Sequence, residues 1–162
     1  MTAASPPLSS DEEAFVRALA RVIIVVPRAL DADLMREQRL SMNEYAALMH
    51  LSEAPDRRMR MSELANACDL SLSGMTRIVT RLEQQTFVER VRCPNDARGW
   101  NAVLTDAGLA RLEQAYPANL ASVRRHIVDH VAGLDLPRIT EALQRFATTG
   151  TCAEKTTDES TA

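Results

Sequence analysis

The chain has 162 residues, of which 46% are hydrophobic and 25% are charged, and its formal net charge is −3. This length and composition fit one globular domain with appendages. The longest apolar run, Val22–Pro27, is far shorter than the roughly 20 residues that a membrane span needs. The N-terminus also lacks the pattern of a secretory signal. We therefore expect a cytoplasmic protein that does not enter a membrane.

The three cysteines, Cys68, Cys93 and Cys152, show no CxxC spacing. This argues against a disulfide framework and against a structural zinc site. Cys68 falls on an apolar position of an expected helix and is interpreted as a small core residue. Cys93 is expected to be exposed beside basic residues, which leaves a redox role open.

Charge is distributed unevenly along the chain. The segment Arg57–Leu104 carries eight basic and five acidic residues, a net charge of +3, whereas the remainder carries −6. Eighteen of the 19 cationic residues are arginine, whose planar fork suits phosphate groups and base edges. A basic middle segment favours a nucleic-acid partner, although a GC-rich genome would also give many arginines.

The first expected helix runs from Ser10 to Glu37. A serine cap and an acidic first turn suit its N-terminus, and Pro27 is expected to kink it. One apolar stripe recurs at steps of three and four residues: Phe15, Leu19, Ile23, Val26, Leu30 and Leu34.

Five more helices are expected, at residues 41–55, 61–69, 70–85, 104–134 and 136–149. Ser41 with Glu44 forms a capping-box pattern, and caps are also expected at Ser62 and Thr105. Pro117 should interrupt the fifth helix. Strands 87–92 and 101–104 enclose a loop at 93–100. Residues 1–8 and 150–162 are polar and unpatterned, and we expect them to form mobile tails.

The helix expected at 70–85 has two different faces. Leu72, Met75, Val79 and Leu82 are spaced three, four and three residues apart, so they are expected to pack inward. The opposite face carries hydrogen-bonding groups and arginines, with no acid before Glu83. The candidate contacts to bases or phosphates are Ser71, Ser73, Gly74, Thr76, Arg77, Thr80 and Arg81. The alternative is an ordinary solvated helix face.

A basic ribbon follows this helix directly. Helix, helix and ribbon is the order of a winged helix-turn-helix, in which the second helix enters the major groove and the wing can place an arginine in the minor groove. Arg92 and Arg98 are the candidate contacts, and Asp96 is expected to brace the loop. Trp100 should anchor the base of the wing. An ordinary turn with a surface ion pair is the alternative for Asp96 and Arg98.

Four segments, in this order, resemble the multiple antibiotic resistance regulator (MarR) family of bacterial transcription factors. They are ELA at 63–65, SLSGMTRIVTRLE at 71–83, FVER at 87–90 and CPNDARGWNAVLTDAG at 93–108. The wing motif DARG at 96–99, followed by a hydrophobic strand and Leu-Thr-x-x-Gly, is the most specific part. One residue departs from the pattern: Thr86 stands where many relatives have a glycine that caps the helix in the left-handed conformation.

The resemblance implies a mainly α fold, an α+β winged helix with six helices and a two-stranded wing. It implies a DNA-binding domain at 41–108 and a dimerisation region formed by 9–40 together with 109–149. The homodimer would bind a pseudo-palindromic operator in double-stranded DNA, more often as a repressor. A small aromatic or phenolic effector would loosen DNA binding. Independently, the long apolar stripes near both ends of the chain favour a dimer interface.

Four residues are candidates for an effector pocket between the DNA-binding lobe and the dimerisation helices: Arg21, Arg28, Tyr45 and His50. The alternative is core packing for Tyr45 and surface positions for the arginines. His126 and His130 are four residues apart and could reach a metal ion, but no further ligands converge on them. A polar helix edge is the favoured interpretation, and no metal or cofactor is expected.

Two other function classes would require features that can be checked in the sequence. A winged helix used for protein contacts, without operator binding, would need an apolar outward face on the helix at 70–85. Ser73, Arg77 and Arg81 argue against such a face. An enzyme would need a nucleophile–base pair, a metal cluster or a glycine-rich phosphate loop. The sequence contains no such pattern, so enzymatic activity is not expected.

Overall fold

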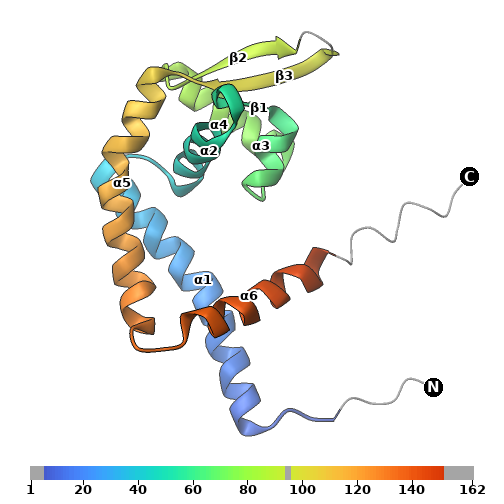
Figure 1. The fold of residues 1–162 in the computed structure, drawn as a ribbon, viewed down its shortest axis with the longest axis vertical. Coiled ribbons are helices and arrows are strands. Elements are labelled where there is room, and N and C mark those ends of the chain that lie inside the picture. Colours follow the sequence, from blue (N-terminus) through green and yellow to red (C-terminus); the bar gives the residue numbers. More distant parts are fainter. Residues whose placement is uncertain (1–5, 94–95, 152–162) are drawn as a thin grey trace, which may run out of the picture. The chain divides into compact units, whose positions relative to one another are not determined.

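The computed structural model describes residues 6–93 and 96–151, without the side chains of 96–98 and 147–151 (Figure 1). The chain forms two compact units, which meet in the sequence between His126 and Ile127. The predicted tails lie mainly outside the described residues. The expected domain boundaries at 8, 40, 108 and 149 stay a prediction.

The first unit contains five α-helices, one short 3₁₀ helix and three strands within the described residues. In chain order they are α1 (Ser10–Gln38), α2 (Met42–Glu53), η1 (Pro55–Arg57), β1 (Arg58–Arg60), α3 (Met61–Ala67), α4 (Leu72–Gln84), β2 (Val88–Cys93), β3 (Asp96–Leu104) and α5 (Asp106–His126). The second unit contains η2 (Val128–Val131) and α6 (Leu136–Thr151). None of the helices in the described ranges is long and apolar enough to cross a membrane.

The predicted helix starts at α1 and α2 are confirmed. Ser9 Oγ accepts from Glu12 N at 3.3 Å, and Ser9 N donates to Glu12 Oε2 at 2.7 Å. Ser41 and Glu44 form the same reciprocal pair at α2. Each box satisfies backbone N–H groups that a helix start otherwise leaves unpaired. The predicted cap at Ser62 is wrong, because α3 begins at Met61, with Arg60 in the cap position.

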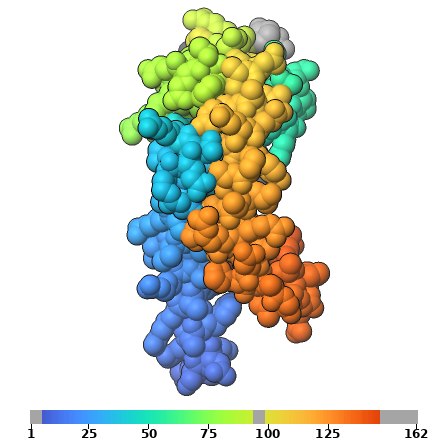
Figure 2. Space-filling view, turned by 90° about the vertical axis from the view of Figure 1, so that its left-hand side faces the viewer, coloured from blue at the N-terminus to red at the C-terminus, as the bar shows by residue number. Residues whose placement is uncertain are grey.

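The expected fifth helix is wrong at its middle and at its end. The helix α5 continues through Pro117 and ends at His126 instead of Leu134. Packing of α5 against α1 and α2, visible in Figure 2, supports the helix on both sides of the proline. Ile127 then leaves helical geometry, with φ −131° and ψ −67°. Gly133, with φ +85°, adopts a left-handed conformation that glycine tolerates.

The sheet has three antiparallel strands in the order β1-β3-β2. The third strand, β1, was expected to be a basic linker, since three residues are too few to show an alternating pattern. The expected loop at 93–100 is also wrong, because β3 already begins at Asp96. Arg92 pairs with Trp100 across the ribbon, and the register shifts between Arg92 and Cys93.

The core of the first unit joins the winged lobe to the long helices. Leu48 of α2, Leu64 of α3 and Met75 of α4 are fully buried. Leu34 of α1 and Leu112 of α5 belong to the same cluster. This shared core holds α4 and the sheet against the two long helices, and therefore sets the orientation of the elements that form the candidate site.

Candidate nucleic-acid interface

The helix α4 has a buried face and an exposed face, as its sequence predicts. Met75, Val79 and Leu82 are fully buried, and Ile78 is buried beside them, although the sequence analysis did not place it inward. The inward orientation expected for Leu72 is wrong, because 54% of this residue is exposed. Leu72 is the first residue of α4 and lines a surface cavity instead of the core.

The first turn of α4 carries three of the predicted contact residues. Ser71 Oγ accepts from Gly74 N at 3.1 Å, so Ser71 is the N-cap of the helix. It also lies 3.2 Å from Ser73 Oγ. Ser73 is exposed. A recognition helix reads base edges with its N-terminal residues, and Ser73 occupies such a position.

The hydroxyls of the two threonines on the outward face donate hydrogen bonds to backbone carbonyls of α4 itself. Thr76 Oγ1 donates to Leu72 O at 2.7 Å, and Thr80 Oγ1 donates to Thr76 O at 2.8 Å. These bonds fix both hydroxyl hydrogens on the helix backbone. The oxygens keep their capacity to accept hydrogen bonds, so these side chains can still act as acceptors at the surface.

The two arginines of the outward face differ in their surroundings. Arg81 Nε lies 3.3 Å from Glu44 Oε1, a carboxylate that is 7% exposed. Arg77 is exposed, and no hydrogen bond or ion pair joins it to another described residue. Arg77 is thus available to an anionic partner, whereas Arg81 already holds α4 to α2.

The acid at the end of α4 is also paired. Glu83 Oε2 lies 2.6 Å from an Arg90 guanidinium nitrogen and accepts a hydrogen bond from Arg90 Nε at 2.9 Å. This pair connects the last turn of α4 to strand β2. This pair, which no local sequence pattern indicates, lowers the repulsion that Glu83 would exert on a phosphate near the helix.

The base of the wing carries the only tryptophan of the chain. The Arg92 guanidinium lies over the Trp100 ring, 5.3 Å from its centroid, in a cation–π arrangement. Trp100 is 42% exposed. A cavity of about 420 Å³ lies between Trp100, Leu72, Thr76, Arg60 and Arg90. Arg90 of the wing and Arg60 of β1 thus face one hollow, to which α4 contributes Leu72 and Thr76.

The tip of the wing holds the predicted Asp96 and Arg98, whose side chains lie outside the described residues. Their roles therefore stay predictions. The exposure expected for Cys93 is wrong: the residue is 8% exposed, and its thiol donates to Asn101 Oδ1 at 3.2 Å. Cys93 is the last residue of β2 and pairs with strand β3, so the residue is buried within the ribbon. Cys68 packs against the core, and burial raises the pKa of its thiol.

The corner between α4 and β2 shows how the helix ends at Thr86, where many relatives have a glycine. Thr86 adopts the left-handed conformation at φ +63°, in the position where a glycine is usual. Its N–H donates to Glu83 O at 2.9 Å, and the Phe87 N–H donates to Leu82 O at 2.9 Å. These two bonds are those of a Schellman motif. The helix therefore ends as it would with glycine, but on a strained β-branched residue.

The four candidates for an effector pocket are not brought together in either of the two described cavities. Tyr45 is 5% exposed and belongs to the core cluster. Burial raises the pKa of its phenol, and a hydrogen bond with Asn119 opposes this. His50 is half-buried on α2, while Arg21 and Arg28 are exposed on α1. A ligand role for these residues stays a prediction.

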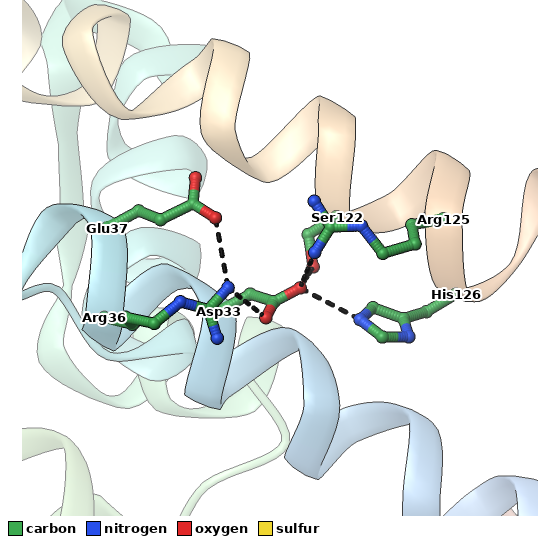
Figure 3. Close-up of polar contacts among 6 residues, drawn as sticks. All are labelled: Asp33, Arg36, Glu37, Ser122, Arg125 and His126. Atoms are coloured by element: carbon green, nitrogen blue, oxygen red, sulfur yellow. Dashed lines mark hydrogen bonds and ion pairs between the residues drawn. The ribbon is translucent and has the colours of Figure 1, made fainter.

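A polar cluster that the sequence analysis missed joins α1 to α5 (Figure 3). Asp33 Oδ2 accepts from Ser122 Oγ at 2.8 Å and from Arg125 at 3.1 Å, and it lies 2.9 Å from His126 Nε2. Asp33 Oδ1 accepts from Arg36 at 2.7 Å. The bonds from Ser122, His126 and Arg36 hold the pKa of Asp33 well below its usual range.

The histidine predicted to lie on a polar helix edge therefore has a defined partner. His126 contacts Asp33 across two helices and is only partly exposed. Among the residues that the structure describes, no three His, Cys, Asp or Glu side chains are placed to hold a metal ion. The spacing of 89 residues between Asp33 and Ser122 explains why no local pattern revealed the cluster.

Comparison with known proteins places this arrangement in one family. Residues 40–99 match the model of the MarR family. AbsC, a MarR family transcriptional regulator from Streptomyces coelicolor, is 36% identical, with a TM-score of 0.80 over 90% of this chain and 97% of AbsC. Sco3205, a MarR family regulator from the same organism solved in complex with DNA, is 30% identical, with a TM-score of 0.82 over 89% of this chain and 90% of Sco3205.

A curated relative agrees with this assignment. The transcriptional repressor YetL of Bacillus subtilis (strain 168) is 32% identical over 84 residues. This match covers 52% of the chain and spans half the length of YetL. The solved relatives are matched over nearly their whole length, and they share both the winged lobe and the order of the helices. The chain therefore belongs to the MarR family of transcriptional regulators.

Proposed function

We propose that the chain is a sequence-specific DNA-binding protein, without enzymatic activity, that represses transcription as a homodimer on a pseudo-palindromic operator. The observation that carries this proposal is the outward face of α4, where Ser73 and Arg77 are exposed next to the wing. The nearby acids, Glu44 and Glu83, are each paired with an arginine. A phosphate backbone would thus meet cations and hydroxyls at this surface, with both carboxylates already engaged.

Two relatives support the proposal. Sco3205 was solved in complex with DNA, and YetL is named a repressor. In this chain we assign base or phosphate contacts to Ser71, Ser73, Gly74, Thr76, Arg77, Thr80 and Arg81, and wing contacts to Arg92 and Arg98, with Asp96 as a brace. Arg81 would act mainly by holding α4 in place through Glu44.

The dimer is proposed from apolar surface on the long helices. Phe15 and Ile23 of α1 are 57% and 63% exposed. In the second unit, Leu143 and Phe146 of α6 are 50% and 49% exposed. Apolar surface of this extent on helices marks an interface. We expect light scattering to give twice the chain mass of 17.9 kDa, and Ile23→Glu to shift the protein toward the monomer.

Fluorescence anisotropy with DNA from upstream of the protein's own gene tests operator binding. We expect specific binding that weakens steeply with salt, because binding to phosphates releases counterions. Arg77→Ala and Arg98→Ala should each lower the affinity by about tenfold to a hundredfold. Arg17→Ala, which removes an exposed arginine of α1, is the matched control. Wild-type affinity in both test variants would contradict the assignment.

We also propose that a small aromatic or phenolic effector releases the protein from DNA. The support is the family resemblance, with Arg21, Arg28, Tyr45 and His50 as candidate contacts. Adding benzoate or 4-hydroxybenzoate to the preformed complex should lower the anisotropy. Tyr45→Phe, which keeps the buried ring, should reduce this response. Unchanged anisotropy with both compounds would count against an effector of this class.

A further inference from the structure

The first turn of α5 lies against the corner between α4 and β2. Thr105 Oγ1 is 2.7 Å from Thr86 O and 3.1 Å from Phe87 O, and these two carbonyls share its one hydroxyl hydrogen. Thr105 N donates to Phe87 O at 3.1 Å. The same hydroxyl oxygen accepts from Gly108 N at 3.0 Å. One side chain therefore caps α5 and holds the corner at the same time.

Gly108 brings the helix closer to this corner than any other residue would allow. A Cβ atom at position 108 would lie 2.1 Å from Phe87 O and 2.7 Å from Leu104 Cδ1. The first of these neighbours is backbone and cannot swing away. The glycine is thus required by close approach, since its own φ is not left-handed.

The corner that is held in this way is the strained one. Thr86 sits at φ +63°. The N–H groups of Thr86 and Phe87 bind the last turn of α4, while their carbonyls bind Thr105, the cap residue of α5. The N–H groups and the carbonyls of this short segment are therefore all hydrogen-bonded. These bonds to α4 and to Thr105 keep Thr86 in its strained backbone conformation.

We propose that Thr105 and Gly108 form a clasp that sets the angle between α4 and the wing, which makes them positioning residues for DNA binding. This inference rests on the proposed function. A recognition helix and a wing can engage one duplex together only at a fixed relative angle. The clasp fixes that angle from α5, which packs along α1 and α2, so a movement of α5 is passed to both DNA-contacting elements together.

The test compares three variants in the anisotropy assay. Thr105→Val removes the hydroxyl and keeps the shape, Thr105→Ser keeps the hydroxyl, and Ser52→Ala removes an unrelated hydroxyl that donates to Met49 O. We expect Thr105→Val to bind the operator about tenfold more weakly, the size of one lost specific contact, while the other two bind like wild type. Trp100 emission should shift only in Thr105→Val, because Trp100 reports on the wing.

A double-mutant cycle separates positioning from general damage. If the clasp places the wing, Arg98→Ala should cost much less affinity in the Thr105→Val background than in wild type, because the wing contact is already lost. Equal losses in both backgrounds, or wild-type affinity of folded Thr105→Val, would overturn the clasp. Absence of specific binding by the wild-type protein would instead overturn the proposed function.

A second variant covers the case in which Thr105→Val does not fold. Thr86→Gly/Thr105→Val relieves the strain at the corner and should fold, because glycine adopts the left-handed conformation freely. We expect this variant to have a native circular dichroism spectrum and operator affinity at least about tenfold below that of Thr86→Gly alone. Equal affinities of these two proteins would overturn the proposal.

Discussion

Arg81 of the proposed DNA-reading helix lies 3.3 Å from Glu44, a nearly buried carboxylate of α2. Glu44 also accepts hydrogen bonds from Ser41 N and Ser41 Oγ, both at 2.8 Å. One carboxylate therefore caps α2 and anchors α4. The position of α4 therefore depends on Glu44, a residue that is not among the proposed DNA contacts.

Replacement of Arg81 should affect stability as well as DNA binding. Arg81→Ala leaves the Glu44 carboxylate without its cation, and we expect the free energy of unfolding to fall by about 1 kcal/mol. Arg77→Ala, four residues earlier on the same face, should change it by less than about 0.5 kcal/mol. Urea unfolding of both variants checks this. Equal stability of the two would mean that the Glu44 pair contributes nothing.

The Asp33 cluster should make the fold sensitive to acid. The pKa of Asp33 is lower in the folded protein than in the unfolded chain, because Ser122, His126 and Arg36 stabilise the carboxylate. As the pH falls, Asp33 therefore takes up a proton in the unfolded state before it does so in the folded state. The contribution of Asp33 to the free energy of unfolding is complete above the unfolded pKa of about 3.9. It is lost progressively as the pH falls from there through the folded pKa.

Asp33→Asn removes this pH dependence. Melting curves between neutral pH and the acid range should show a smaller acid-induced loss of stability for Asp33→Asn than for wild type. At neutral pH the variant should be less stable than wild type. Asp129→Asn changes an exposed aspartate and is the control. A wild-type acid profile in Asp33→Asn would show that the cluster is not the source of the sensitivity.

The Thr86 corner offers a stabilising substitution. Thr86→Gly places the usual residue at φ +63° and should raise the free energy of unfolding by about 1 kcal/mol, because the left-handed conformation costs about that much for residues with a Cβ. Thr86→Ala keeps the Cβ and should give no comparable gain. Denaturant titrations distinguish the two. A gain of equal size with alanine would locate the effect outside the backbone conformation.

Gly108 should tolerate no side chain. Gly108→Ala would place a methyl group 2.1 Å from Phe87 O, so α5 must move away from the corner. We expect a loss of about 3 kcal/mol or more, typical of overpacking against backbone. In Gly74→Ala the new Cβ meets only the Ser71 hydroxyl, at 3.2 Å, and alanine favours the helix. Thermal melts should show this variant close to wild type.

Most helix positions and most caps could be predicted because their signals are local. Ser9 and Ser41 cap their helices through residues three positions away, and Thr105 caps α5 through Gly108. The buried face of α4 follows from the spacing of its apolar residues, apart from its first residue, Leu72. The family resemblance rested on segments of this kind, and the comparisons confirmed it.

By itself, the sequence determined the order of the helices, the two faces of α4 and the family, because side chains a few residues apart suffice to specify caps, periodicity and motifs. Only the tertiary structure decided which polar side chains pair. Arg81 meets Glu44, Asp33 meets Ser122, and Thr105 meets Thr86 across separations of 19 to 89 residues. Such pairs form where packing brings distant elements together, and short-range periodicity carries no record of that geometry.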